Sequence, residues 1–140
     1  MKGTGCALVV DDEATDRAAI VKSLRGRFAS LLQAESFVEA MAVFDRFVNS
    51  VQFLVTDISL PDGNGCDLAV KIHRQKPNLR VLFVSGDVGA QLCRYYGLDL
   101  NDLHFLRKPF TKSQLLERIE AILNTKQSFP TLRLPKALTA

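Results

Sequence analysis

The chain has 140 residues, of which 47% are hydrophobic and 24% are charged, with a formal net charge of +3. This length and composition are typical of one globular domain with its own core, and they exclude a disordered chain. The charge excess is small and no long run of lysine or arginine occurs, so we expect no direct contact with nucleic acid. No apolar segment is long enough for a signal peptide or a membrane span, which predicts a cytoplasmic protein without membrane contact.

The cysteines and histidines give no motif of their own. Cys6, Cys66 and Cys93 are odd in number and form no CxxC pair. They therefore indicate neither a disulfide framework nor a zinc site, and each is expected to be a small buried hydrophobic residue. His73 is expected at the surface, and His104 in a structural position before a strand.

The first element is the continuous apolar run CALVV over residues 6–10. Because polar and apolar residues do not alternate in it, it predicts a strand that is covered on both faces. An apolar helical stripe from Ile20 to Phe28 follows, and Gly26 weakens the end of this expected helix. Residues 30–34 predict a second strand.

A helix is expected next, because Ser36 begins the S-x-x-E pattern of a capping box. It should end near Asn49. Residues 53–57 then form an apolar run that stops at Asp57, and the turn-forming sequence LPDGNG follows at once. This pattern predicts a buried third strand that ends in a loop.

The second half of the chain continues the alternation of helices and strands. A helix through Leu68 is expected to end at residues 76–78. Residues 80–84 predict the fourth strand, residues 89–96 a short helix, and residues 103–107 the fifth strand.

The last helix is expected to begin at the capping box of Thr111 and to end near Thr125. Residues 126–140 contain two prolines and no clear period. They predict a tail or the start of a linker, after one domain over residues 1–125. Five strands that alternate with five helices predict a doubly wound α/β fold with a parallel sheet in the flavodoxin-like order 2-1-3-4-5.

Polar side chains end four of the expected strands, namely Asp11 with Asp12, Asp57, Ser85 and Lys108. In this strand order the four ends are gathered at one edge of the sheet, where open α/β sheets bind ligands. Clustered carboxylates repel each other and need a cation, and Mg²⁺ prefers oxygen ligands. A carboxylate beside Mg²⁺ and a lysine can act as a nucleophile and form an aspartyl phosphate. The plainer alternative is a structural salt bridge between aspartate and lysine.

The sequence resembles the receiver domain of response regulators in two-component signalling over residues 5–125. The resemblance rests on the motifs VVDDE, VTDISLPDGNG, FVSGD and FLRKPF, in this order. It implies that Asp57 is the phosphoacceptor. It also implies that Asp11, Asp12 and the backbone carbonyl of Ser59 bind Mg²⁺ together with Asp57.

Three further roles follow from the resemblance. Lys108 and Ser85 are expected to contact the phosphoryl group, and Phe105 is expected to be the aromatic residue that rearranges on activation. Ser85 stands where threonine is commoner and Phe105 where tyrosine is frequent, so a hydroxyl donor is kept and a phenol is absent. Phosphorylation should draw Ser85 toward the phosphoryl group and let Phe105 turn inward, which would reshape the surface of the fourth helix, fifth strand and fifth helix.

The loops around these residues are expected to be shaped by Pro61, Gly63, Gly65 and Pro109. The resemblance implies a histidine kinase or a histidine phosphotransfer protein as phosphoryl donor. It implies a downstream protein target or a covalently linked effector as the recipient of the signal. A homodimer through the fourth helix, fifth strand and fifth helix is compatible with it.

Three alternatives stay open from the sequence. The chain can be a stand-alone protein or a receiver fragment of a larger transcriptional regulator or hybrid kinase, and its initial methionine and short tail favour a stand-alone protein or an N-terminal fragment. A phosphatase with an aspartyl nucleophile usually carries D-x-D after its first strand, whereas Asp11 and Asp12 are adjacent. We therefore expect no dedicated enzymatic turnover. The last alternative is a binding module that is never phosphorylated.

Overall fold

A five-stranded parallel sheet forms the centre of the computed structural model, which describes residues 3–86, 89–99 and 103–132. The spatial order of its strands is β2-β1-β3-β6-β8. These strands are β1 (Cys6–Val10), β2 (Ser30–Ala34), β3 (Val51–Asp57), β6 (Arg80–Ser85) and β8 (Phe105–Arg107). Since β6 and β8 are the fourth and fifth strands of this sheet along the chain, the predicted order is confirmed.

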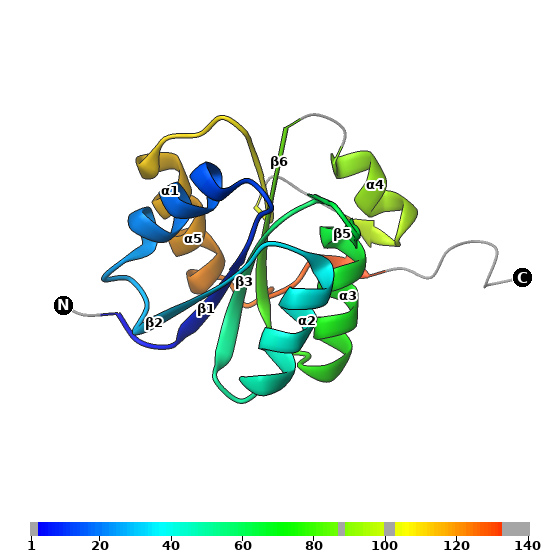
Figure 1. Cartoon of the computed structure of the whole chain (residues 1–140), viewed down its shortest axis with the longest axis horizontal. Coiled ribbons are helices and arrows are strands. Elements are labelled where there is room, and N and C mark those ends of the chain that lie inside the picture. Colours follow the sequence, from blue (N-terminus) through cyan, green and yellow to red (C-terminus); the bar gives the residue numbers. More distant parts are fainter. Residues whose placement is uncertain (1–2, 87–88, 100–102, 133–140) are drawn as a thin grey trace, which may run out of the picture.

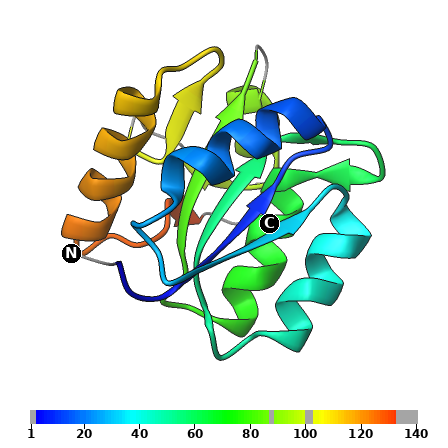
Figure 2. The ribbon, with the colours of Figure 1, turned by 60° about the vertical axis from the view of Figure 1, so that its left-hand side comes forward.

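Two layers of helices cover the sheet (Figures 1 and 2). The helices of the described chain are α1 (Ala14–Leu24), α2 (Phe37–Arg46), α3 (Gly65–Gln75), α4 (Gly89–Tyr95) and α5 (Lys112–Asn124). Helices α1 and α5 lie side by side on one face, and α2 lies beside α3 on the other. The doubly wound architecture is therefore as predicted. No helix of the described residues is both long and apolar enough to cross a membrane.

Each face of the sheet has its own apolar core. In β1, Ala7 and Val9 pack with the α1 and α5 side, whereas Leu8 and Val10 pack with the α2 and α3 side. All residues of β1 are buried. A strand with helices on both faces cannot present a polar row to water, which explains why CALVV is continuously apolar.

The first helix is shorter than the sequence predicted. It ends at Leu24, and Gly26 has a left-handed backbone with φ of +86°. This conformation, which favours glycine, turns the chain away from the helix axis. Phe28 consequently lies after the helix and is buried instead by packing edge-on against Phe53, with 5.7 Å between ring centroids.

Capping by side chains starts two helices where the sequence predicted them. The Oγ of Ser36 accepts a hydrogen bond of 3.1 Å from the N–H of Glu39. At α5, Thr111 and Gln114 form both hydrogen bonds of a capping box, 2.8 and 3.1 Å long. These bonds satisfy N–H groups that have no partner inside the helix.

The prediction for the cysteines was wrong for two of the three. A disulfide bond joins Cys66 in α3 to Cys93 in α4, with 5.2 Å between their Cα atoms. Cys6 is a buried free thiol in β1, as predicted. The two bonded residues are 27 positions apart, so only the packing of the two helices brings them together and no local spacing reveals the pair.

The beginning of the expected tail is part of the folded body. Residues 126–132, here called the C-terminal strap, include β9 (Thr131–Leu132), which pairs antiparallel with β7 (Leu98–Asp99). Phe129 of the strap is only 6% exposed and stacks on the imidazole of His73 at 3.9 Å. His73 is therefore half-buried, which corrects its expected surface position, and His104 is fully buried. Residues 133–140 of the predicted tail lie outside the described residues.

Candidate functional site

The predicted site residues meet at the carboxyl ends of neighbouring strands. Asp11 directly follows β1, Asp57 is the last residue of β3, Ser85 is the last residue of β6 and Lys108 follows β8. The sheet order puts β1, β3, β6 and β8 next to each other. The topology thus gathers side chains that are separated by up to 97 positions in the sequence.

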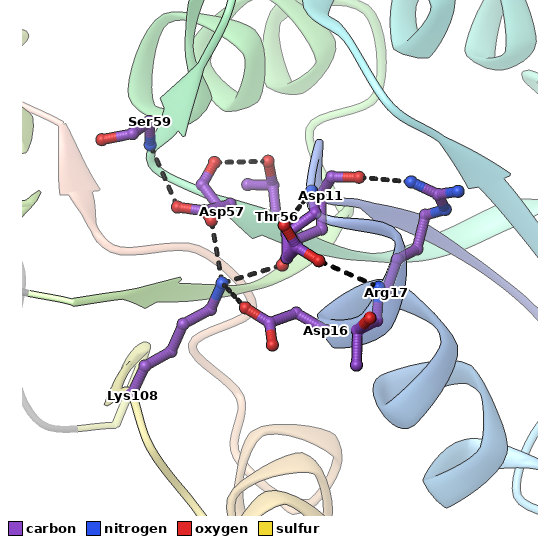
Figure 3. A network of polar contacts seen from close by, with 9 residues as sticks. Asp11, Asp16, Arg17, Thr56, Asp57, Ser59 and Lys108 are labelled. Carbon is purple, nitrogen blue, oxygen red and sulfur yellow. Dashed lines mark hydrogen bonds and ion pairs between the residues drawn. The ribbon is translucent and has the colours of Figure 1, made fainter.

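The ammonium group of Lys108 is the centre of this site (Figure 3). Its Nζ lies 2.8 Å from Oδ2 of Asp11 and 2.9 Å from Oδ2 of Asp57. A third carboxylate, that of Asp16 in α1, approaches the same Nζ at 3.2 Å. Because an ammonium group has three N–H donors, these three acceptors use its full hydrogen-bonding capacity.

The two inner carboxylates are also held by backbone N–H groups. Oδ1 of Asp11 accepts a hydrogen bond of 2.9 Å from the N–H of Glu13, and Oδ1 of Asp57 accepts one of 3.1 Å from the N–H of Ser59. The side chain of Asp11 is 0% exposed and that of Asp57 is 13% exposed. Both oxygens of each carboxylate are thus fixed in a site that water reaches mainly on the side of Asp57.

Burial and charge act in opposite directions on the ionisation of this site. Burial raises the pKa of the Asp11 carboxyl above its usual value, and the hydrogen bond from Lys108 only partly offsets this effect. Burial alone would lower the pKa of Lys108, but its hydrogen bonds to Asp11 and Asp57 and their charges outweigh burial and raise it. The lysine is therefore firmly charged at neutral pH.

The carboxylates of Asp11, Asp12 and Asp57 are close enough to share a cation. Each offers an oxygen atom, and these atoms lie within 4.8 Å of one another. Asp12 is exposed, so the group opens toward solvent. The donor set is composed of hard carboxylate oxygens with room for water, which fits the preference of Mg²⁺. One lysine cannot balance the negative charges of this group, and Mg²⁺ would do so.

A family model described as the response regulator receiver domain matches residues 7–120. The chain belongs to this family. The receiver fold and role that the sequence predicted are confirmed, and an acidic group of Asp11, Asp12 and Asp57 is present.

Relatives of this receiver differ in how much of their own length it spans. Chemotaxis protein CheY1 of Helicobacter pylori is 31% identical over 122 residues, which are 84% of this chain and 96% of that protein. Sensor kinase CckA of Brucella abortus is 28% identical over 123 residues, 88% of this chain but only 13% of that protein. The crystal structure of the receiver domain from the hybrid histidine kinase CckA superposes with a TM-score of 0.68 at 26% identity and covers 86% of this chain and 100% of that chain.

The loop after Asp57 in this receiver is a small hairpin that is fixed at both ends. Its strands are β4 (Ser59–Leu60) and β5 (Gly63–Asn64), which pair antiparallel. The side chain of Asn64 accepts a hydrogen bond of 2.8 Å from the N–H of Asp67 and so caps α3. Ser59 is held at the site by the bond from its N–H to Asp57, while the metal-binding role of its carbonyl stays a prediction.

Two glycines and an aspartate of this loop explain its fixed path. A Cβ atom on Gly65 would lie 2.2 Å from the carbonyl oxygen of Asp57, so only glycine fits directly behind the predicted phosphoacceptor. A Cβ on Gly63 would touch the ring of Phe37 at 3.0 Å. The carboxylate of Asp62 accepts hydrogen bonds from the first N–H groups of α2, at 2.7 and 3.0 Å, and these bonds lower its pKa.

The other predicted residues of the receiver lie around the same edge. Ser85 is buried, and its carbonyl accepts a hydrogen bond of 2.8 Å from the N–H of Lys108. Phe105 is half-buried in β8 and packs against the core under α2 and α3. The peptide bond between Lys108 and Pro109 is cis, and Pro61 lies at the exposed turn of the hairpin.

Sequence reasoning missed two residues of α1 that contact the site. Asp16 approaches Lys108, and the guanidinium of Arg17 donates a hydrogen bond of 2.7 Å to the carbonyl oxygen of Asp11. The available signal was position, because the first turn of a helix that follows a strand end faces the same edge of the sheet. Asp16 lies in the first turn of α1, four positions after Asp12.

Proposed function

We propose that this receiver accepts a phosphoryl group on Asp57 from a histidine kinase or a histidine phosphotransfer protein. The observation that carries the proposal is the simultaneous contact of Lys108 with Asp57 and Asp11, beside the exposed carboxylate of Asp12. A purely structural salt bridge needs one carboxylate and one lysine. An excess of carboxylates around one lysine costs electrostatic free energy, which supports a function that uses a cation.

The proposed transfer is an in-line displacement on phosphorus. A carboxylate oxygen of Asp57 forms a bond to the phosphorus atom while the bond from phosphorus to the donor imidazole nitrogen breaks. Lys108 lies 2.9 Å from Asp57 and stabilises the negative charge on the transferring oxygens. When bound by Asp11, Asp12, Asp57 and the Ser59 carbonyl, Mg²⁺ would supply further charge neutralisation at this place. We propose no dedicated enzymatic turnover for this receiver.

The phosphorylated state is proposed to be read through a shift of populations. A neutral hydrogen bond from Ser85 contributes about 0.5–1.5 kcal/mol, and a charged one from Lys108 about 1.5–3 kcal/mol. Inverting a 1:99 equilibrium takes about 5.5 kcal/mol, which is more than this sum. The rearrangement of Ser85 and Phe105 should therefore be graded and be completed by a partner. That partner is a downstream protein, a linked effector or a second receiver bound at α4, β8 and α5.

The direct test is labelling with acetyl phosphate in the presence of Mg²⁺, followed by intact-mass measurement. The wild-type receiver should gain the mass of one phosphoryl group, and Asp57→Asn should gain none. Asp45→Asn is the matched control, because Asp45 is an exposed aspartate on α2, and this variant should label like the wild type. Chelation of Mg²⁺ should abolish labelling of the wild type.

Two other outcomes would replace the proposal. Failure of the wild type to label with Mg²⁺ present would support a binding module that is never phosphorylated. Multiple turnover of a small phosphoester, measured as phosphate released per protein, would support the phosphatase-type alternative. If beryllofluoride, a phosphoryl mimic, leaves the NMR resonances of Phe105 and α4 unchanged, the proposed switch is wrong even though Asp57 accepts phosphate.

A further inference from the structure

Asp16 is a third carboxylate on the site lysine, and it differs from the other two in position and exposure. Asp11 and Asp57 lie at strand ends inside the site, whereas Asp16 lies in the first turn of α1. Its side chain is 48% exposed, against 0% for Asp11 and 13% for Asp57. Its oxygen is 3.2 Å from Nζ of Lys108, so this ion pair stands at the rim of the site.

The position of Lys108 does not depend on Asp16. Asp11 and Asp57 already hold the ammonium group at 2.8 and 2.9 Å, and both are themselves fixed by backbone N–H groups. Asp16 takes the remaining N–H donor of Lys108 and points it away from Asp57, toward α1 (Figure 3). A phosphoryl oxygen on Asp57 would need a donor from this same ammonium group.

We propose that Asp16 competes with the phosphoryl group for the ammonium group of Lys108. This inference rests on the proposed function of Asp57. While Asp57 is unmodified, the third N–H of Lys108 donates to the carboxylate of Asp16 at the solvent-facing side of the site. During phosphorylation the phosphoryl oxygens compete with Asp16 for this ammonium group, and the negative charge of Asp16 also opposes theirs. Asp16 therefore lowers both the rate of phosphorylation and the affinity for a phosphoryl mimic.

The test compares Asp16→Asn with Asp16→Glu and with a control that changes the net charge equally. In acetyl-phosphate labelling, Asp57 bonds to phosphorus as acetate leaves. Asp16→Asn removes the competing carboxylate, so it should speed labelling and tighten beryllofluoride binding. Because partly exposed ion pairs contribute little, we expect these changes to be only about two- to fivefold. Asp16→Glu, which keeps the carboxylate, should stay near wild type. Glu35→Gln is the control, because Glu35 is exposed after β2 and is not among the described partners of Lys108.

A second readout does not depend on phosphorylation. In Mg²⁺-free protein, the NMR resonance of the Lys108 side-chain nitrogen should shift in Asp16→Asn and remain in place in Glu35→Gln. Unchanged labelling, binding and resonance in Asp16→Asn would overturn the inference, and so would slower labelling, which would mean that Asp16 holds Lys108 for catalysis. If the wild type labels on Asp57, the proposed function stands in either case; if it does not label, the proposed function itself fails.

Discussion

The two ends of the central sheet both collect cationic side chains, but they give them different partners. At the carboxyl end, Lys108 is bound by carboxylates. At the amino end, Nζ of Lys76 donates hydrogen bonds to the carbonyl oxygens of Val48, which follows α2, and Val51, the first residue of β3. The guanidinium of Arg80 donates in the same way to the carbonyls of Ile122 and Thr125, at the end of α5.

This difference separates a structural arrangement from a functional one. Backbone carbonyl oxygens carry partial negative charge, so the lysine and the arginine at the amino end tie main-chain segments together. At the carboxyl end, Asp11 and Asp57 share one lysine, and together with the nearby carboxylate of Asp12 they leave an excess of negative charge. At the amino end the two cations donate to neutral carbonyls, whereas the carboxyl end has an excess of carboxylates that fits a cation.

The division between a structural amino end and a functional carboxyl end would be contradicted if a change at the amino end altered phosphorylation. The substitution with the largest expected effect there is Phe129→Ala. Phe129 is buried in the C-terminal strap against His73, and large-to-small changes of buried phenylalanine cost about 3–5 kcal/mol. We expect a loss of this size in the free energy of unfolding, measured by urea denaturation. The rate of acetyl-phosphate labelling per folded protein should not change.

The control for this change is Tyr95→Ala in α4. Tyr95 is 77% exposed, so its removal should alter the free energy of unfolding by less than about 0.5 kcal/mol. If Phe129→Ala destabilises no more than Tyr95→Ala, the strap is not part of the core in solution. If Phe129→Ala slows labelling of the folded protein, the two ends of the sheet are coupled and the separation fails.

A pair of lysine substitutions sharpens the same comparison. Lys76→Met removes charged hydrogen bonds to two carbonyls, and we expect the free energy of unfolding to fall by about 1.5–3 kcal/mol, with labelling unchanged. Lys108→Met removes the charge that faces the phosphoryl group. With Mg²⁺ present it should slow labelling roughly 10- to 100-fold, which corresponds to the same energy range expressed as a rate.

The two variants act as controls for each other, since each replaces a half-buried lysine by a side chain of similar length. Labelling rates at saturating Mg²⁺ and urea midpoints should be measured for both. A slow Lys76→Met or a fast Lys108→Met would contradict the division between a structural and a functional end.

The sequence predicted the sheet because its signals are local. The apolar run of β1 and the turn after Asp57 lie within a few residues, and the strand order then places Asp11, Asp57 and Lys108 together. Site chemistry at strand ends is thus readable once the topology is known. The extent of α1 was overestimated, because a helical stripe alone does not show that Gly26 takes a left-handed conformation.

What could not be predicted depends on packing between distant segments. The Cys66–Cys93 disulfide and the contact of Phe129 with His73 each join residues without a shared motif. Asp16 was missed for a related reason. Its role comes from the direction in which the first turn of α1 faces, and a sequence pattern gives only its spacing.

The last prediction concerns the acid side of neutrality, where the amino end should be the first to weaken. Burial lowers the pKa of both His73 and His104. For His104, the positive charge of Arg80 lowers the pKa further, while backbone hydrogen bonds with the strap residues Gln127 and Ser128 partly offset the lowering. In the unfolded chain the histidines bind protons near their ordinary pKa of 6.5, whereas in the folded chain they bind protons only at a lower pH. The contribution of these neutral histidines to stability is therefore complete above pH 6.5, and the free energy of unfolding should fall as the pH drops below this value.

The matched test is His73→Gln against Arg74→Gln, which alters the exposed neighbour of His73. Urea unfolding between pH 7 and about 5 should show a weaker pH dependence in His73→Gln than in the wild type or Arg74→Gln, because one proton is no longer taken up on unfolding. Asp11 works in the opposite sense, since burial raises its pKa and lets the folded state bind a proton first. Measuring the histidine variant relative to Arg74→Gln cancels this contribution. An equal slope in both variants would mean that His73 is solvated, as the sequence alone predicts, and that the strap does not cover it.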